Sequence, residues 1–450
     1  MKGEKFDVFV IGSGVAGKTV AENCEAAGLK VAVAEKREFG GTCANHGCDP
    51  KKVLLGPTEI LQRTSDLAGK GIMEIPKLDW KALQKFKKTF TSDIPKETKR
   101  DFKEKNITVF SGSPEFIGPN SLKIKDVKIV ADKIVIATGL EPRKMDIEGS
   151  KFLKQSNDFL SLKKLPKKII FLGAGYIGME FAQMAARAGS RVTILDHGDR
   201  PLDSFDSDLV SLVEQVSKDL GIEFIYNVKI ESLRKKENNF KLKYEVGNKK
   251  KSKKVDAVFN TAGRVPAIKK LNLKAAKIAH DDNGITVDEY LCSKTNHAIY
   301  ACGDVSDHSM PLSPLSGFEA NVVSENIING NSKKIEVPWV PSVVFTIPNV
   351  ASVGYSEEEA KRRYKSVSIK YSEAADWYNN KRVNGSAYAY KILINDRTDL
   401  IVGAHLLGTE AGEVINLFTM AMNIKLKANE LRKMIFTYPS WCNDIKLMLT

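Results

Sequence analysis

Cysteine and long apolar stretches are scarce in this chain of 450 residues, and each shortage excludes a class of protein. Six cysteines are too few for a secreted scaffold held together by disulfides, so we expect any disulfide to serve chemistry rather than stability. No apolar run approaches the roughly 18 to 20 residues needed to span a bilayer, and the N-terminus lacks the layout of a signal peptide. We therefore expect a cytoplasmic protein with no membrane partner.

Composition and charge describe a folded chain with an excess of positive charge. Hydrophobic residues make up 42% and charged residues 28%, which excludes a disordered polymer or a fibre. The length predicts two to four domains. The net charge of +14 could attract nucleic acid or anionic cofactors, but the lysines are scattered. The densest run, at 249–254, is interpreted as a solvated turn between strands, with a polyanion site as the alternative.

Two segments of the chain share one design. Residues 6–35 and 168–196 each predict a buried strand, a glycine-rich turn, a helix and a second strand. This repeated spacing is the main sign of how the chain is organised. It predicts two nucleotide-binding βαβ units.

Each unit carries the pattern G-x-G-x-x-G between its first strand and its helix. The first glycine permits a tight turn, the second lets a pyrophosphate approach the backbone, and the third lets helix and strand pack closely. An acidic residue, Glu35 or Asp196, follows the third glycine by 18 positions, where it can accept hydrogen bonds from ribose. The alternative is a glycine turn that binds nothing. The glycines are Gly12, Gly14 and Gly17, then Gly173, Gly175 and Gly178.

Further strands complete the predicted organisation. Apolar runs ending in small residues occur at 133–139 and 257–263. Beyond about residue 334 the pattern changes to a separate α+β region, with strands expected at 343–346, 351–355 and 388–394.

A pair of cysteines lies in the run GGTCANHGCDPKK at 40–52. In a regular helix, Cα atoms five positions apart are roughly 8.6 Å apart, beyond the roughly 7 Å limit for a disulfide. A bridge between Cys43 and Cys48 therefore needs an irregular turn, which Gly47 makes easier. Because so short a loop contributes little cross-linking entropy, we interpret the pair as a redox couple.

Such a couple can pass electrons from a hydride donor, through a flavin, to a substrate. One thiol attacks the substrate while the other remains a thiolate, and nearby positive charge favours that thiolate. Lys51, Lys52 and His46 could supply the charge, and Asp49 opposes it. Two alternatives stay open: a metal site formed by both cysteines and His46, or two reduced structural cysteines.

Motifs along nearly the whole chain resemble those of the pyridine nucleotide-disulfide oxidoreductases, the family of glutathione reductase, dihydrolipoamide dehydrogenase and mercuric reductase. The resemblance rests on the first G-x-G-x-x-G, GGTCANHGCDPKK, IVIATG, GAGYIGMEFA, TAGRVP, IYACGD, PSVVFTIPNVASVGYSEEEA and GAHLLGTEAGEVIN. It implies an α/β fold with two Rossmann-like domains, for FAD and NAD(P), and a C-terminal α+β dimerisation domain. The implied boundaries are 1–148 with 261–333 for FAD, 149–260 for NAD(P)H, and 334–450 for the interface.

The resemblance also implies which residues bind the cofactors. Gly12, Gly14, Gly17, Glu35 and Asp304 would hold FAD, and Gly173, Gly175 and Gly178 would bind NADH or NADPH. The remaining implied cofactor-binding residues are Gly41, Thr42, Thr138, Gly139, Tyr176, Asp196, His197 and Gly263.

The catalytic residues are implied in the same way. Cys43 would be the interchange thiol and Cys48 the charge-transfer thiol beside the flavin. Lys51 and Glu180 match the family's ion pair next to that ring, and Tyr176 matches an aromatic residue that shields it. In this family the C-terminal segment of one subunit completes the other's active site, which implies a homodimer. No nucleic-acid partner and no metal are expected.

The C-terminal segment departs from the family pattern. The disulfide reductases carry a His-Pro pair with a glutamate five residues after the histidine, whereas here Tyr438 and Asn443 stand at those positions. A tyrosine titrates near pH 10, so it is no ready base at neutral pH, although it can donate a proton to a leaving thiolate. Asp444 has no certain role, and Cys442 is interpreted as an inert thiol.

Other departures concern the substrate and the nucleotide. Glu22 and Asn321 stand where glutathione reductases bind their substrate through arginine, which weakens the case for glutathione disulfide. Mercuric reductases share the tyrosine, but their C-terminal vicinal cysteines are missing. His197 and Asp203 replace the arginines that clamp NADPH, and the acidic Asp196 favours NADH, although His197 and Arg200 could compensate.

These features together predict an FAD-dependent NAD(P)H oxidoreductase that passes electrons through Cys43 and Cys48 to a small disulfide-type acceptor. A second hypothesis keeps the flavin and dithiol but reduces a soft metal ion or a quinone-like oxidant. A third is a non-catalytic relative that binds FAD.

Overall fold

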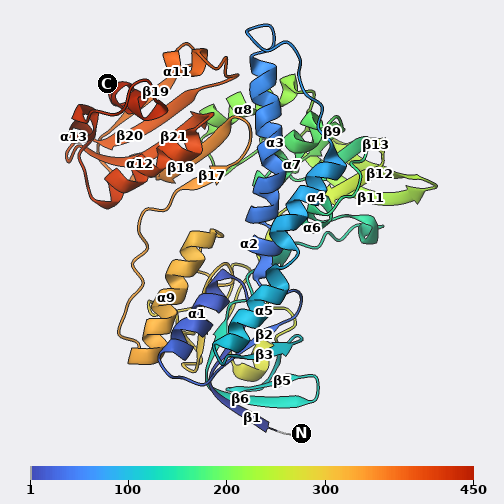
Figure 1. Ribbon diagram of the computed structural model, residues 1–450, viewed down its shortest axis with the longest axis vertical. Helices are drawn as coiled ribbons and strands as arrows, with labels where there is room; N and C mark the ends of the chain where they lie inside the picture. Colours follow the sequence, from blue (N-terminus) through green and yellow to red (C-terminus); the bar gives the residue numbers. More distant parts are fainter. Residues whose placement is uncertain (1–2) are drawn as a thin grey trace. The chain divides into compact units, whose positions relative to one another are not determined.

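The computed structural model describes residues 3–450, which divide into two compact units (Figure 1). The first unit contains the residues up to Val53, then Lys85–Arg143 and Gly263–Glu336. The second contains Leu54–Gln84, Lys144–Ala262 and Val337–Thr450. Helices α3 (Cys48–Asp66) and α4 (Trp80–Thr91) each run from one unit into the other.

A seven-stranded sheet forms the centre of the first unit, in the order β3-β2-β1-β6-β5-β4 with β16 beside β6. Strands β1, β2, β3, β6 and β16 run parallel, while β4 and β5 extend the sheet antiparallel. The strands are β1 (Gly3–Ile11), β2 (Val31–Glu35), β3 (Thr108–Ser111), β4 (Glu115–Gly118), β5 (Ser121–Ile124), β6 (Val127–Ile136) and β16 (Ile299–Ala301). A short antiparallel pair, β7 (Leu140–Pro142) and β15 (Arg264–Pro266), lies outside it.

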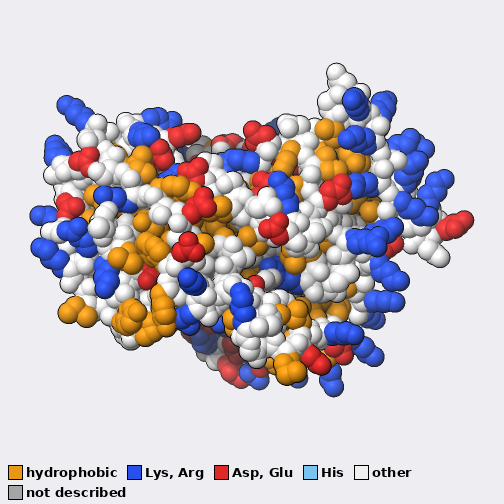
Figure 2. All heavy atoms as spheres, turned by 90° about the horizontal axis from the view of Figure 1, so that it is seen from above, with side chains coloured by type: hydrophobic (Ala, Val, Ile, Leu, Met, Phe, Trp, Pro, Cys, Tyr) orange, Lys and Arg blue, Asp and Glu red, His pale blue; other side chains and the backbone are white. Residues whose placement is uncertain are grey.

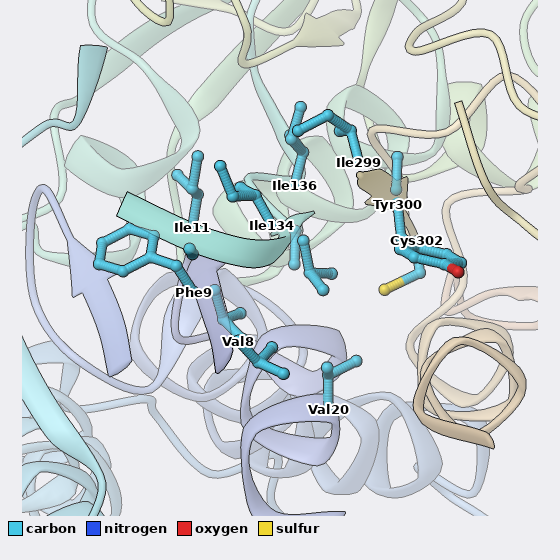
Figure 3. Packing of buried hydrophobic residues seen from close by; sticks show 14 of the residues in the cluster. Val8, Phe9, Ile11, Val20, Ile134, Ile136, Ile299, Tyr300 and Cys302 are labelled. Carbon is cyan, nitrogen blue, oxygen red and sulfur yellow. The ribbon is translucent and has the colours of Figure 1, made fainter. Parts of the chain in front are cut away.

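Strand β2 and the carboxyl-terminal halves of β1 and β6 are apolar on both faces, and both faces are buried there. Figure 3 shows Phe9 and Ile11 of β1 beside Ile134 of β6, with Val20 of the following helix on one side. Such strands are near-continuous apolar runs rather than alternating patterns. The helices of this unit are α1 (Val15–Ala26), α2 (Gly41–His46), α5 (Ile94–Glu104), α9 (Ser313–Asn329) and the 3₁₀ turn η2 (Leu273–Ala276).

The second of the two predicted βαβ units has its own parallel sheet, in the order β10-β9-β8-β14. Its predicted strand–turn–helix–strand plan is confirmed by β8, α7 and β9. The elements are β8 (Lys168–Leu172), α7 (Tyr176–Arg187), β9 (Arg191–Leu195), α8 (Ser207–Asp219), β10 (Glu223–Ile225) and β14 (Ala257–Asn260), preceded by η1 (Ser150–Phe152) and α6 (Ser156–Leu160).

A three-stranded antiparallel sheet is inserted before β14: β11 (Val228–Lys236), β12 (Asn239–Val246) and β13 (Lys249–Val255). The interpretation of residues 249–254 as a turn is wrong. The turn lies at Gly247 and Asn248, which both adopt positive φ, and the lysines form β13 itself, paired in continuous register with β12. A run of like charge therefore forms a regular edge strand.

The C-terminal region confirms the predicted α+β domain. Its five-stranded antiparallel sheet has the order β17-β18-β21-β20-β19. The strands are β17 (Ser342–Val344), β18 (Asn349–Gly354), β19 (Val367–Glu373), β20 (Ala389–Asn395) and β21 (Leu400–Gly408). The helices are α10 (Glu357–Arg363), α11 (Tyr378–Lys381), α12 (Ala411–Asn423), α13 (Ala428–Lys433) and α14 (Ile445–Met448), with the 3₁₀ turn η3 (Trp441–Asp444). Among the described residues, no helix has the length and apolar character needed to cross a bilayer.

Candidate active site

The first glycine turn joins β1 to α1 at the carboxyl end of the first sheet. Gly12 has φ +110°, and a Cβ there would lie 2.3 Å from the carbonyl oxygen of Ala137. A Cβ on Gly17 would lie 2.0 Å from the carbonyl oxygen of Gly12. Gly14 differs, because the atom nearest to a Cβ there would be the Cα of Gly41, at 3.6 Å. The first and third glycines are thus required by packing, while the second keeps open space in front of the helix N-terminus, where a phosphate binds.

The second glycine turn, between β8 and α7, repeats this geometry. Gly173 has φ +109°, and a Cβ on Gly178 would lie 2.0 Å from the carbonyl oxygen of Gly173. A Cβ on Gly175 would meet no atom of residues 3–450 within 4 Å apart from its own chain neighbours. Tyr176, the next residue, is 45% exposed. The two turns thus share the same division between packing glycines and one open glycine.

In both βαβ units, the acidic residue at the end of the second strand is hydrogen-bonded to the glycine turn of that unit. Glu35 accepts hydrogen bonds from the backbone N–H groups of Ser13 (3.1 Å) and Arg37 (2.9 Å), and from the Ser13 hydroxyl (2.8 Å). Asp196 accepts from the N–H groups of Ala174 (2.5 Å) and Gly198 (2.6 Å). Each carboxylate is therefore held beside the open glycine, as ribose recognition requires.

Around the first turn, other predicted residues form a cradle that fits FAD. A Cβ on Gly41, which has φ +73°, would lie 2.3 Å from the Cα of Gly14, so only glycine permits this approach. The buried Thr138 hydroxyl has no hydrogen-bond partner among residues 3–450. A buried hydroxyl without a partner is costly, so it marks a place for a polar ligand atom. Gly139 and Gly263 follow at positive φ, and Thr42 lies in the first turn of α2.

Asp304, at the end of β16, belongs to the same cradle. Burial raises the pKa of this carboxyl, while a hydrogen bond from Ser316 (3.3 Å) and the charge of Arg264 act in the opposite direction. A carboxyl of this kind accepts hydrogen bonds from a hydroxyl-bearing cofactor at low desolvation cost.

The cysteine pair occupies a break between two helices. α2 ends at His46, Gly47 has non-helical angles (φ −134°, ψ −119°), and α3 begins at Cys48. A Cβ on Gly47 would lie 2.9 Å from the carbonyl oxygen of Thr42 and 3.1 Å from the Cα of Cys43. The irregular turn expected at Gly47 is confirmed, and its missing side chain lets the backbone around the pair close up.

Both cysteines are free thiols in the structure. The hydrogen bond from Cys43, with help from Ser313 and the charge of Lys51, lowers the pKa of Cys48 to about 6, while burial and Asp49 oppose this shift. The same hydrogen bond, together with burial, raises the pKa of Cys43. The position of Cys48 at the first residue of α3 and the charge of Lys51 both favour a thiolate there.

Two residues at this site were missed by the sequence reasoning. The Ser313 hydroxyl lies 3.7 Å from the Cys48 sulfur, although the two residues are 265 positions apart. Asn45 is buried and donates to the carbonyl oxygens of Phe39 (2.9 Å) and Gly41 (3.0 Å), which fixes the turn in front of Cys43. The position of Asn45 between the two cysteines could have marked it in the sequence as part of the site. Only the fold brings Ser313 to Cys48.

The alternative metal site is not supported. His46 pairs with Glu38 (3.3 Å), and no group of three potential ligands arranged to hold a metal occurs within residues 3–450.

The C-terminal residues lie in the second unit. Tyr438 is 69% exposed, and its ring stacks near that of Tyr378, with centroids 6.3 Å apart. Asp444 is buried and accepts from Asn379 (2.9 Å) and Tyr388 (3.1 Å), and burial raises its pKa. Asp444 is thus engaged in hydrogen bonds inside its own domain. Cys442 packs against the core of the same domain, and burial raises its pKa.

The remaining predicted residues are also placed. Glu180 is buried and accepts from the backbone N–H of Phe345 (2.9 Å), and His197 is exposed beside Asp196 (3.4 Å). Lys51 belongs to the first unit and Glu180 to the second, so their ion pair stays a prediction. In the first unit, Glu22 pairs with Lys105 (2.9 Å), and Asn321 accepts from Asn23 (2.9 Å).

Comparison with known proteins identifies the family. The family model described as pyridine nucleotide-disulphide oxidoreductase matches residues 6–320, and the model of its dimerisation domain matches residues 340–448. The chain belongs to this family.

Its relatives differ in what they reduce. The chain is 30% identical to a glutathione reductase of Burkholderia cepacia over 98% of this chain and 97% of that protein. It is 28% identical to a mercuric reductase of Lysinibacillus sphaericus, over 99% and 82%. Among solved structures, the Cu(II) complex of the HOCl-induced flavoprotein disulfide reductase RclA from Escherichia coli matches with a TM-score of 0.88 and 28% identity, over 99% of both chains.

Family membership confirms the expected fold and class of enzyme. The protein is an FAD-dependent, NAD(P)H-linked disulfide oxidoreductase with two nucleotide-binding Rossmann-like domains and a C-terminal dimerisation domain.

Proposed function

We propose that Cys43 and Cys48 are the redox couple of this enzyme and that they reduce a small disulfide-type acceptor. The observation that carries the proposal is the geometry of the pair: Cys43 and Cys48 lie on either side of the helix break at Gly47, and Cys48 begins α3, where a helix N-terminus favours a thiolate. FAD, when bound, accepts two electrons from the nicotinamide and supplies them to the couple.

The steps follow from thiol–disulfide exchange. The Cys43 sulfur gives up its proton and attacks one sulfur of the substrate, forming a mixed disulfide and releasing the first thiolate. Cys48 then attacks the Cys43 sulfur and releases the second thiolate. Two thiols thereby become one disulfide, and the substrate disulfide becomes two thiols that take up two protons.

We propose that the leaving thiolate receives its proton from Tyr438 of the partner subunit. A tyrosine hydroxyl is a proton donor at neutral pH. The arrangement needs a homodimer, for which the C-terminal domain offers exposed apolar side chains: Met434, Ile435, Tyr438 and Leu447. We assign residues 1–148 with 261–333 to FAD binding, 149–260 to NAD(P)H and 334–450 to the interface.

A second acceptor class is favoured by specific observations. The substrate-binding positions in the first unit carry Glu22 and Asn321, which offer no cation to the carboxylates of glutathione disulfide. The relatives include a mercuric reductase and a Cu(II) complex of a flavoprotein disulfide reductase. A soft metal ion binds thiolates and needs no strong base. We therefore keep a soft metal ion, or a quinone-like oxidant, as the alternative acceptor.

An acceptor screen separates these proposals. We expect NADH-driven reduction of lipoamide or another small disulfide to exceed that of glutathione disulfide by about tenfold or more in kcat/KM, a difference of about 1.4 kcal/mol. Oxidation of NADH is followed with glutathione disulfide, lipoamide, other low-molecular-weight disulfides, mercuric and cupric ions and a quinone. Turnover with the metal ions or the quinone but with no disulfide would reject the leading proposal and support the alternative.

We also propose that NADH is the electron donor. The Asp196 carboxylate would repel the 2′-phosphate of NADPH, and the Arg200 guanidinium already donates to the carbonyl oxygens of Asp203 (2.5 Å) and Phe205 (3.2 Å). An arginine held by these two hydrogen bonds is poorly placed to bind the 2′-phosphate of NADPH and so to offset its repulsion by Asp196.

Steady-state kinetics with the two nucleotides checks this assignment. We expect kcat/KM for NADH to exceed that for NADPH by roughly tenfold or more, and Asp196→Asn to narrow the ratio because it removes the repelling charge. Asp199→Asn, which makes the same charge change at an exposed position nearby, serves as the control and should leave the ratio unchanged. A wild-type preference for NADPH would contradict the proposal.

A further inference from the structure

The positive charge of the molecule is concentrated on one small sheet. Strands β11, β12 and β13 with their two turns carry eleven Lys and Arg and only three Glu, a net +8 out of the chain's +14. Figure 2 shows Lys and Arg side chains crowded over this part of the second unit. The expectation that the lysines are scattered is thus wrong for residues 228–255, which carry more than half of the net charge and fold into this one sheet.

Like charges face each other directly across these strands. Arg234 of β11 lies opposite Lys241 of β12, and Lys241 lies opposite Lys254 of β13. Leu242 and Tyr244 of β12 are buried, so the alternating Lys241 and Lys243 belong to the outer face. Like charges directly opposite each other destabilise a sheet. The sheet keeps an unfavourable arrangement that an anionic partner would relieve.

The protein's own carboxylates neutralise only part of this charge. Glu148 pairs with Arg234 (3.0 Å), Glu231 with Lys250 (3.8 Å), and Glu223 with Lys253. Within the described residues, no carboxylate lies within ion-pair distance of four exposed ammonium groups, those of Lys241, Lys249, Lys251 and Lys254.

The cations lie on both sides of an edge strand. Among residues 3–450, β13 pairs with β12 alone, which leaves its other edge unpaired. Lys249 and Lys251 belong to the side of β13 that continues the buried face of β12, and Lys250 and Lys254 belong to the outer side. Figure 1 shows these strands projecting from the rest of the second unit. Because Leu242 and Tyr244 pack on the domain core, the exposed cations lie on the outer face of the sheet and along the edge strand β13.

We propose that the sheet β11–β13 binds the phosphate backbone of duplex nucleic acid. A duplex carries a dense row of phosphates, which the exposed cations of the outer face and of the edge strand can contact together. No large apolar or aromatic side chain of residues 228–255 is exposed, so nothing on the sheet inserts into a bilayer or stacks on unpaired bases. Binding through phosphates alone is independent of sequence and strongly dependent on salt.

Fluorescence anisotropy with the FAD-loaded protein and a labelled DNA duplex of about 30 base pairs tests the proposal. We expect a Kd of roughly 10⁻⁶ to 10⁻⁴ M near physiological salt, with weakening between roughly 50 and 200 mM salt. Removing four of these charges should reduce the slope of log K against log salt concentration by about 3 to 4 and weaken binding at least about tenfold at low salt. The variant is Lys241→Gln/Lys249→Gln/Lys251→Gln/Lys254→Gln. The control, Lys269→Gln/Lys270→Gln/Lys274→Gln/Lys277→Gln, removes the same charge from exposed positions in the first unit. It should weaken binding by less than about threefold.

Each outcome decides the proposal. Neither variant touches a residue placed in the redox site, so NADH-driven turnover reports that both are folded. Should the fourfold variant fail to fold, the four single variants, each expected to lower the slope by roughly 0.9, replace it. Equal losses in both fourfold variants, or no binding at low salt, would overturn the proposal. Binding to vesicles of phosphatidylserine and phosphatidylcholine without binding to the duplex would also overturn it.

Discussion

Cys48→Ser is expected to abolish reduction of the disulfide acceptor, with a loss of about 1,000-fold or more in kcat/KM. A serine hydroxyl is not ionised at neutral pH and cannot form a disulfide with Cys43, so the couple no longer exists. FAD binding should survive, because the groups proposed to hold FAD lie at the strand ends around Gly12, Glu35 and Thr138.

Anaerobic titration with NADH provides the measurement. In the wild-type enzyme a long-wavelength absorbance band is expected from a Cys48 thiolate beside the flavin, and Cys48→Ser should lose it. Because the pKa of Cys48 is lowered to about 6, the thiolate is populated above that pH, and the band should fade as the pH falls through about 6. A Cys48→Ser protein that retains the band would remove Cys48 from its assigned role.

Three matched variants separate the roles of the thiols. Cys43→Ser keeps the Cys48 thiolate, so it should keep the band while losing acceptor reduction. Ser313→Ala removes a hydrogen bond that lowers the pKa of Cys48, so the midpoint of the band should move to higher pH. Cys442→Ser changes a thiol packed against the C-terminal core and should alter neither the band nor turnover.

Features encoded by a short stretch of chain were predictable from the sequence. The two glycine turns follow from contacts between residues five positions apart, such as Gly12 and Gly17, and these are the same wherever the turn occurs. The break at Gly47 was predictable because a regular helix holds Cys43 and Cys48 too far apart. In each case, a distance between residues close in the sequence determines the local backbone conformation.

Features that depend on distant strands or loops were not predictable. Residues 249–254 were interpreted as a turn because a run of charged residues is typical of a solvated turn. Pairing with β12 instead makes them a strand, and Gly247 and Asn248 supply the positive φ angles of the turn. Ser313 reaches Cys48 only because α9 begins beside the helix break. Asp444 was of uncertain role until Asn379 and Tyr388 were seen to bind it.

The second and third glycines of the two turns should respond in opposite ways to the same substitution. Gly14 and Gly175 have φ of −72° and −69°, which alanine adopts, and a Cβ there would meet nothing closer than 3.6 Å. Gly14→Ala and Gly175→Ala should therefore fold normally while placing a methyl group where a pyrophosphate approaches. Gly14→Ala is expected to lower FAD content, and Gly175→Ala to raise KM for NADH by about tenfold or more, a loss of about 1.4 kcal/mol.

Alanine at the third position instead meets a backbone carbonyl at 2.0 Å in both turns, and no flexible side chain can move aside. Gly17→Ala and Gly178→Ala should therefore lower the free energy of unfolding by about 1–3 kcal/mol or prevent folding. Thermal unfolding, bound FAD and NADH kinetics measured on all four variants distinguish the two causes. If Gly14→Ala and Gly175→Ala lost stability as the other two do, the open space before each helix would reflect packing rather than a ligand. If both kept wild-type cofactor binding, the assignment of the two turns to FAD and NAD(P)H would be wrong.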